Sequence, residues 1–360
     1  MIIIRIARRF IHWWTGLRLV GFALLALAFL IGALGYLNQL GWLYLTETAK
    51  QIIADFYVNA STDLASVAII ILVVEALYQR RETEREKRQL IVQLGSSDGA
   101  SAREAARALQ VRGWLRDGSV NKANLHAANL QEANLQWASL REANLRQANL
   151  QGANLKYADL QDANLTDANL QDANLTEANL QGASPYEASL QGANLKYANL
   201  QGAGLTGVSF QGASLYEANL QGATLRYADL QNANLMRANL QYANLKEANL
   251  QDANLKYANL QDADLTQADL QDANLKHANL QDADLVSANL KGASLWAANL
   301  QDVDLGQADL RGALLGATNL QGGNVSHAKY DDSTVWPEGF TPPPEAIGLE
   351  AESGQNDLLE

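Results

Sequence analysis

The sequence predicts an all-β solenoid, a four-sided β-helix of about ten coils that follows a helical N-terminal region. The main observation is a five-residue unit, Ala-Asn/Asp-Leu-x-x, which recurs from Ala123 to Tyr330 without insertion or deletion. The leucine and alanine of each unit lie two positions apart, so both face the same side of a short extended segment. Because a period of five fits neither a helix nor a flat strand, the two remaining residues must turn the chain. Four such segments close a square, which gives about 20 residues per coil.

This tandem Ala-Asn-Leu-x-x motif resembles the pentapeptide-repeat family over more than half of the 360 residues. The resemblance implies a right-handed quadrilateral β-helix, a handedness that the spacing alone does not give. It also implies that the rods pair end to end in many members, so a homodimer is among the expected states. The segment after Leu94 and the ending from Tyr330 to Pro337 also look similar to the flanks of membrane-anchored members.

A few residues depart from the repeat. Pro185 and Phe210 stand where leucine is expected, and Gly204 stands where Asn or Asp is expected. Because proline has no backbone N–H and replaces a core leucine, Pro185 predicts a local defect or bend in the rod.

Charge and composition divide the chain into unlike regions. Residues 1–122 hold 15 bases against 10 acids, residues 123–330 hold 12 against 21, and residues 331–360 hold 8 acids and no base. The last region therefore predicts a C-terminal cap that continues into a disordered acidic tail. The chain has no cysteine, which excludes disulfides, thiolate nucleophiles and cysteine metal sites.

Residues 1–79 are expected to form a transmembrane hairpin with spans near 19–37 and 58–78. The first span has 19 uncharged residues, about 28 Å of helix, which is close to the thickness of the bilayer core. A cleaved signal peptide is an alternative for this segment, although its apolar run exceeds the usual length. The uncharged run of the second span, Leu64 to Val74, is only 11 residues long, so a buried or interfacial helix is an alternative there.

Basic residues flank both spans on their outer sides, whereas the connecting stretch 38–57 holds one lysine against two acids. By the positive-inside rule, both termini and the repeats lie on the cytoplasmic side. We therefore expect a two-span membrane protein in contact with lipid. The connecting stretch has no filter-like sequence, so we expect no channel.

Residues 80–122 are expected to cap the open N-terminal end of the solenoid. A charged helix continues to Leu94, and the sequence Gly-Ser-Ser-Asp-Gly then breaks it. Ser101 and Glu104 have the spacing of a capping box for a second, short helix. Trp114 and the apolar face of this helix are expected to cover the exposed end of the stack; the face consists of Ala102, Ala105, Ala106 and Leu109.

Stacking the repeats at 20 residues per coil predicts which side chains share a row along the rod. Glutamine occupies two opposite rows, Gln161 to Gln321 and Gln131 to Gln271, whose amides we expect to bond from coil to coil. Basic and aromatic residues share another row, consisting of Lys156, Lys196, Lys256, Lys276, Tyr216 and Trp296. Such a row could bind nucleic acid, but the net negative charge of the repeats opposes phosphate binding, so we do not expect it.

Acidic residues gather in one patch of the predicted rod. Two stacked rows flank an inward alanine on one face and are expected to point outward together: Asp262, Asp282, Asp302 and Asp264, Asp284, Asp304. Like charges about 4.8 Å apart repel each other, so the patch could bind a cation or a basic partner. The alternative is a solvated acidic face without a ligand.

The sequence favours a non-enzymatic scaffold at the cytoplasmic membrane face that binds a protein partner. The histidines fall in separate rows, and we find no Ser-His-Asp set and no phosphate-binding loop, so we expect no catalytic residue, metal or cofactor. The resemblance supplies an alternative, because some soluble members of the family mimic duplex DNA and bind type II topoisomerases. That role needs a regular anionic surface, which the 12 bases of the repeats interrupt.

Overall fold

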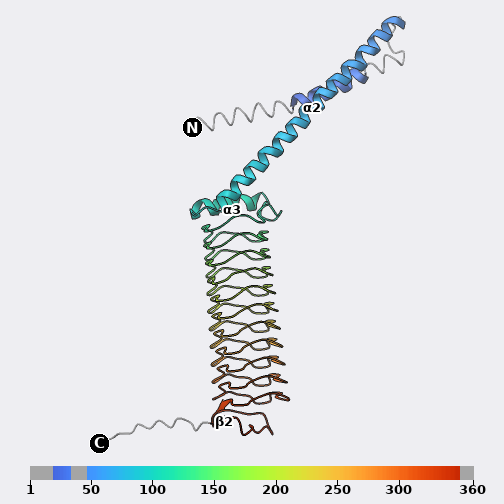
Figure 1. Cartoon of the computed structure of the whole chain (residues 1–360). Helices are drawn as coiled ribbons and strands as arrows, with labels where there is room; N and C mark the ends of the chain where they lie inside the picture. The colour runs from blue at the N-terminus through green and yellow to red at the C-terminus, as the bar shows by residue number, and fades with distance from the viewer. Residues whose placement is uncertain (1–18, 34–46, 349–360) are drawn as a thin grey trace. The chain divides into compact units, whose positions relative to one another are not determined.

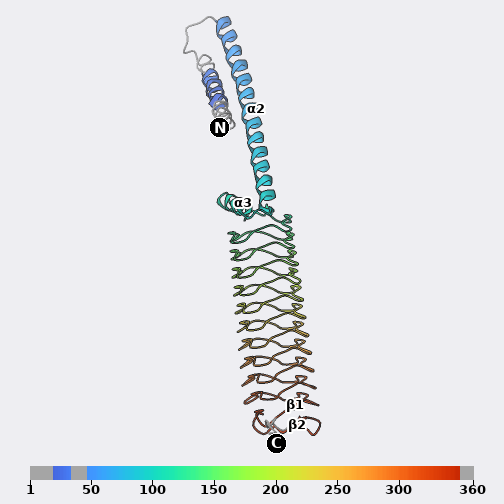
Figure 2. The same ribbon diagram turned by 90° about the vertical axis from the view of Figure 1, so that its left-hand side faces the viewer.

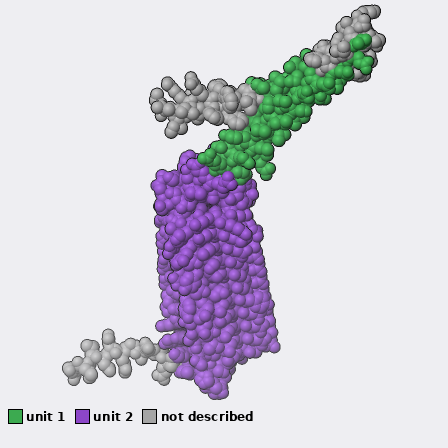
Figure 3. Space-filling model, turned by 45° about the horizontal axis from the view of Figure 1, so that its top comes forward, with its two compact units in different colours: residues 1–86 green, residues 87–360 purple. Residues whose placement is uncertain are grey.

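The computed structural model of the chain describes residues 19–33 and 47–348. The chain divides into two compact units, Met1–Glu86 and Lys87–Glu360 (Figure 3). The described part of the first unit is helical, and the second unit contains the solenoid (Figures 1 and 2).

Two helices make up the described part of the first unit. The helix Leu19–Ala33 is short and apolar, and α2 spans Glu47–Leu94, with its end from Lys87 belonging to the second unit. A Cβ atom added to Gly21 would lie 3.1 Å from Leu72 Cδ2, and one added to Gly32 would lie 3.5 Å from Ser61 Oγ. The two helices are therefore antiparallel neighbours, and glycine permits their close approach.

One helical segment of the described residues, Val58–Leu94, is long and apolar enough to cross a membrane by length and composition. It contains the second expected span. The helix Leu19–Ala33 is shorter than the first expected span, because residues 34–37 lie outside the described residues.

The second short helix, α3, spans Gly99–Val111, and its N-cap is Asp98 rather than Ser101. The Asp98 carboxylate accepts bonds from the backbone N–H of Ser101 at 3.0 Å and from its hydroxyl at 2.6 Å. The capping box predicted from Ser101 and Glu104 was therefore wrong, because a carboxylate three residues earlier satisfies the free N–H groups. These bonds also hold the pKa of Asp98 below its usual value.

The apolar face of α3 covers the first coil. Its alanines and Leu109 are buried in one continuous cluster with the leucines of the solenoid, and Trp114 packs against that cluster. The segment also supplies backbone acceptors, since Asn129 N–H donates to Ser96 O at 2.9 Å and Ser139 N–H donates to Leu115 O at 2.7 Å. The end of the stack thus finds both apolar and hydrogen-bonding partners.

Each coil contains 20 residues, as predicted. Parallel bridges join Asn124 to Asn144 and continue at the same spacing to Asp309 and Lys329. These extended positions form isolated bridges rather than long strands, because a turn interrupts the chain after every three extended residues. The named strands are β1, Lys329–Tyr330, and β2, Ile347–Gly348, which pair in parallel at the C-terminal end.

The hydrogen bonds of the pentapeptide explain its central Asn or Asp. Leu135 N–H donates to Asn154 O in the next coil at 2.8 Å, and Ala133 N–H donates to Leu130 O at 3.0 Å. The first turn residue has no such backbone acceptor, and Gln136 N–H instead donates to the side-chain oxygen of Asn134 at 3.2 Å. An Asn or Asp between alanine and leucine therefore satisfies the one N–H that the coil leaves over.

The second turn residue of each repeat has a left-handed backbone. Its φ is 57° at Lys122 and 63° at Tyr257, and 32 non-glycine residues in all share this region. None of them is valine, isoleucine or threonine, whereas the first turn position includes Thr166 and Val286. Branching at Cβ raises the cost of positive φ, so the backbone restricts the second position more than the first.

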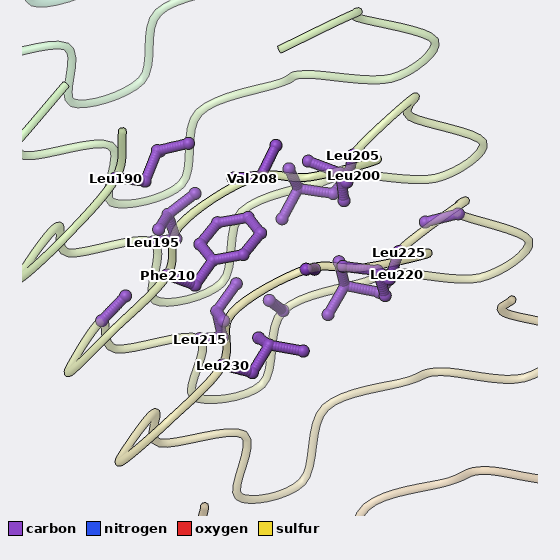
Figure 4. Packing of buried hydrophobic residues seen from close by; sticks show 14 of the residues in the cluster. Leu190, Leu195, Leu200, Leu205, Val208, Phe210, Leu215, Leu220, Leu225 and Leu230 are labelled. Carbon is purple, nitrogen blue, oxygen red and sulfur yellow. The ribbon is translucent and has the colours of Figure 1, made fainter. Parts of the chain in front are cut away.

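The interior is a stack of leucine and alanine with one large substitution. Phe210 lies in the row of Leu190 and Leu230 and is fully buried beside Val208 (Figure 4). At Pro185 the predicted defect is confined to one bridge. Bridges join Asn164 to Ser184 and Gly204 to Thr224, but within the described solenoid none joins Ser184 to Gly204.

The C-terminal end breaks the 20-residue register once. Leu314 pairs with Val335, one residue later than the repeat dictates. Asp331 accepts hydrogen bonds from Ser333 and from the Gly312 N–H, which hold its pKa below the usual value. Trp336 packs between Tyr330 and Phe340 at ring distances of 5.7 and 5.1 Å. The expected tail from residue 349 onward lies outside the described residues.

Candidate interaction surfaces

The variable side chains of the rod lie at four corners, each a stack of two-residue turns. We call the stack from residues 141–142 to 301–302 the acidic corner and that from 136–137 to 296–297 the aromatic corner. The extended residues between them, from 138–140 to 298–300, form the amide side. Its central row continues from Asn179 to Asn299 without a charge.

The predicted glutamine ladders form in part. On the acidic corner, amides bond in series from Gln181 to Gln261, with nitrogen-to-oxygen distances of 3.2 to 3.4 Å. On the opposite corner, Gln171 donates to Gln191 at 2.8 Å. At Gln281 and Gln301 the amide donates instead to the next residue, an aspartate. A carboxylate is the stronger acceptor, so the ladder ends where aspartate follows glutamine.

A second set of ladders was not predicted. The side chain of Asn219 donates to Asn199 Oδ1 at 3.1 Å, and Asn199 donates to Asn179 at the same distance. The same oxygens accept the turn N–H groups, so each amide bonds in two directions. The recurring Asn/Asp of the repeat was the available signal, but its outward direction alone did not reveal these partners.

The six aspartates of the predicted patch occupy two kinds of position. Asp262, Asp282 and Asp302 are turn residues of the acidic corner with φ between 54° and 57°. The other three lie on the adjoining side, where each Oδ1 accepts a turn N–H at 2.9 to 3.0 Å, and they are Asp264, Asp284 and Asp304. This second row therefore does the work that asparagine does elsewhere in the rod.

The geometry of the acidic patch does not form a metal centre. Among residues 19–33 and 47–348, no group of three or more His, Asp or Glu side chains could hold a metal ion. Binding of a single cation or a basic partner by the patch stays a prediction.

The aromatic corner is wider than the single row predicted from the sequence. Rings of the second turn position join the predicted row, and consecutive coils bring them into contact. Trp137 stacks on Tyr157 at 4.0 Å, and Tyr257 stacks on His277 at 5.0 Å. Tyr197, in the second position, meets Tyr216 of the predicted row edge-on at 5.7 Å.

Cations accompany these rings. Lys156 lies 4.6 Å from the centre of the Tyr157 ring, and Lys256 lies 5.0 Å from that of Tyr257. Five bases stand at this corner against two acids. One of those acids, Glu217, is held by Arg237 at 3.2 Å, and hydrogen bonds from Tyr216 and Arg237 lower its pKa. The corner therefore combines exposed aromatic rings with net positive charge on a rod that is acidic as a whole.

A cavity of about 630 Å³ lies near the C-terminal end, on the side of the rod opposite the amide side. Its lining includes Lys291, Arg311 and Lys329. Arg311 is bound to Asp309 at 2.6 Å, and this bond is the main cause of the lowered pKa of Asp309. The cavity interrupts the second glutamine ladder, where lysine and arginine replace glutamine.

Comparison with known proteins agrees with this geometry. A family model described as pentapeptide repeats matches overlapping segments from residue 115 to residue 329. HetL, a pentapeptide repeat protein involved in heterocyst differentiation regulation from the cyanobacterium Nostoc, is 33% identical. The match covers 60% of this chain and 90% of HetL, with a TM-score of 0.35.

Two further structures are similar to parts of the chain. A pentapeptide repeat protein of the Arabidopsis thaliana thylakoid lumen is 31% identical over 29% of this chain and 68% of its own, with a TM-score of 0.18. QnrB1, a plasmid-mediated fluoroquinolone resistance protein, is 15% identical over 54% of this chain and 87% of its own, with a TM-score of 0.32. A search of curated proteins finds no match. With the family model matching more than half of its residues, the chain belongs to the pentapeptide-repeat family.

Proposed function

We propose that the protein is a non-enzymatic scaffold, anchored in a membrane by its N-terminal hairpin, whose rod binds a protein partner at the cytoplasmic face. The observation that carries the scaffold role is the aromatic corner. Tyr197, Tyr257 and Trp296 are each about half exposed, at 51%, 46% and 50%, although every other function of the repeat is served by small or amide side chains. Tyrosine and tryptophan beside cations are typical of protein-binding surfaces.

The surface of the first unit supports the membrane anchor. Phe29, Leu19 and Ile70 are 80%, 70% and 61% exposed, whereas Ala28 and Ala68 are buried. Small residues inside and large apolar residues outside are typical of helices that pack together in lipid. A soluble protein would expose this apolar surface to water at a cost. The two spans and the cytoplasmic orientation rest on the charges that flank them.

The anchor can be tested by labelling with cysteine, which the natural chain lacks. Asn38→Cys places a thiol in the predicted connecting stretch, and Asn249→Cys places one on the rod. In intact cells a membrane-impermeant maleimide should label the first and spare the second until the membrane is opened. Labelling of both thiols in intact cells, or recovery of the chain in the soluble fraction, would refute the proposed topology.

The scaffold role can be tested by cross-linking in native membranes followed by purification of the chain. Tyr197→Ala with Tyr257→Ala should lose the cross-linked partner that the natural chain retains. Gln211→Ala with Gln231→Ala changes two residues of the opposite corner and serves as the control. Equal recovery of the partner by both double variants would show that the aromatic corner is not the binding surface.

The alternative role, inhibition of a type II topoisomerase by DNA mimicry, fits the charge distribution less well. Acids are consecutive only at Asp262, Asp282 and Asp302 of the acidic corner, and bases dominate the aromatic corner. A DNA-like surface requires regularly spaced negative charge along its length. A gyrase supercoiling assay with the purified chain separates the two proposals, since inhibition at stoichiometric concentration would favour mimicry.

A further inference from the structure

We propose that two copies of this chain pair side by side, parallel to each other, through the amide side of the rod. The two-fold axis would run along the rods, between the two amide sides. The occupant of this face is thus a second copy of the same chain, and the pairing does not depend on the membrane anchor.

The two edges of the amide side carry opposite charge. The aromatic corner has five bases against two acids, and the acidic corner has five acids against one base. At the same height on the rod, Lys256 of one corner faces across the side toward Asp262 of the other, and Lys276 toward Asp282. The face between them is built from uncharged asparagine ladders in its last seven coils. One surface therefore offers both members of each ion pair.

Symmetry selects the parallel arrangement. A two-fold axis along the rods places the aromatic corner of one copy against the acidic corner of the other, at both edges of the interface. A two-fold axis across the rods would make the copies antiparallel and would place bases against bases and acids against acids. Only the first arrangement joins opposite charges.

The middle of the rod is complementary in shape. There the acidic corner has glycine at Gly202 and Gly222, and a Cβ added at either position would meet nothing within 4 Å. The aromatic corner has Tyr197 and Tyr216 at the corresponding heights. In the proposed pair, the tyrosines of one copy lie over the glycines of the other, where no side chain obstructs them.

The size of the face suits a stable pair. Ten coils at about 4.8 Å give a length of roughly 50 Å, and three extended residues with their corner side chains give a width of roughly 15 Å. Each copy would then bury about 700 Å², close to the value of about 800 Å² per partner in standard interfaces.

Cross-linking tests the geometry of the pair. Asn259 lies in the central row of the amide side, next to the proposed axis, so Asn259→Cys brings two thiols together across faces about 10 Å apart. Asn249→Cys is the matched control, because it occupies the same repeat position on the opposite side of the rod. With the full chain in detergent micelles, a short bismaleimide should dimerise the first variant at least tenfold faster than the second.

Charge reversal tests the ion pairs independently. Lys256→Glu with Lys276→Glu replaces four exposed attractive pairs of the dimer by repulsive ones and should weaken dimerisation roughly 30-fold in sedimentation experiments. Asp262→Lys with Asp282→Lys should weaken it similarly, and the turn tolerates lysine because Lys122 has φ 57° at the same repeat position. An equimolar mixture of the two double variants cannot restore every pair within one dimer, but the quadruple variant can and should recover the original affinity.

The outcomes distinguish the proposal from other assemblies. A chain that remains monomeric at micromolar concentration would overturn it. A dimer in which Asn249→Cys cross-links as fast as Asn259→Cys would show pairing through a different surface and would also overturn it. So would a dimer whose affinity ignores all three charge variants, because end-to-end contact or association of the hairpins would then account for it.

Discussion

Replacing Pro185 by leucine should stabilise the rod, because the proline removes a hydrogen bond that every neighbouring coil makes. In the coils on either side, Leu165 N–H donates to Ser184 O at 3.0 Å and Leu205 N–H donates to Thr224 O at 2.8 Å. At Pro185 the corresponding donor is missing, while Gly204 N–H still donates to Ala183 O at 2.9 Å. The backbone is thus held on both sides of the gap in the position that a leucine would need.

The gain can be worked out from three contributions. A restored backbone hydrogen bond contributes about 1 kcal/mol to the free energy of unfolding. One additional buried methylene contributes about 0.8 kcal/mol. The greater freedom of the unfolded chain without proline opposes these by about 0.4 to 1 kcal/mol. The net expectation is a stabilisation of about 1 kcal/mol, which corresponds to roughly fivefold slower exchange of protected amides.

Amide hydrogen exchange provides the local assay, since a solenoid opens repeat by repeat and a single melting temperature can conceal a local change. The amides of Leu165 and Leu205 should exchange more slowly in Pro185→Leu. Leu165→Pro is the reciprocal control and should accelerate exchange in its own coil. Unchanged or faster exchange in Pro185→Leu would mean that the coil is adapted to proline, and the reasoning from the regular neighbours would fail.

Three further predictions concern the core and the two ends of the rod. Leu230→Ala should destabilise the rod by about 2 to 5 kcal/mol in urea unfolding, because Leu230 is 1% exposed, and a cost below 1 kcal/mol would contradict a close-packed interior. Asp98→Ala should shorten the protection of α3 by about 1 kcal/mol in hydrogen exchange, whereas Ser101→Ala, which keeps the backbone donor, should cost less. Asp309 has a lowered pKa through Arg311, so its contribution to stability is present above about pH 4 and is lost as the pH falls through the folded pKa; thermal unfolding of Asp309→Asn should therefore show a smaller loss between pH 7 and pH 3 than the natural chain.

The period of the repeat made most of the fold predictable. A leucine at every fifth residue determines both the coil and its 20-residue stacking, and the bridges from Asn124 onward follow that spacing. The cap was predicted correctly as an apolar face on α3, but its N-cap was not. Asp98 and Ser101 are both good capping residues, and only the backbone geometry distinguishes them.

The surfaces were predictable only row by row. The sequence placed Lys256 and Trp296 in one row, but the stacking of Tyr257 on His277 depends on the adjacent turn position. Its left-handed backbone directs side chains in a way that the spacing does not specify. The asparagine ladders were missed for a related reason, since an outward side chain can still bond along the surface to the next coil.

The four-repeat coil has a consequence for how such a chain can change in length. Loss of one pentapeptide would turn everything after it by a quarter of the circumference, so that the residues of the aromatic corner would continue on a different corner. Loss or duplication of 20 residues would instead shift the following coils by about 4.8 Å along the axis and leave every row aligned. Genes of this kind can therefore lengthen or shorten the protein as a ruler is cut at its divisions, in steps of one coil, without rewriting the surface that a partner recognises.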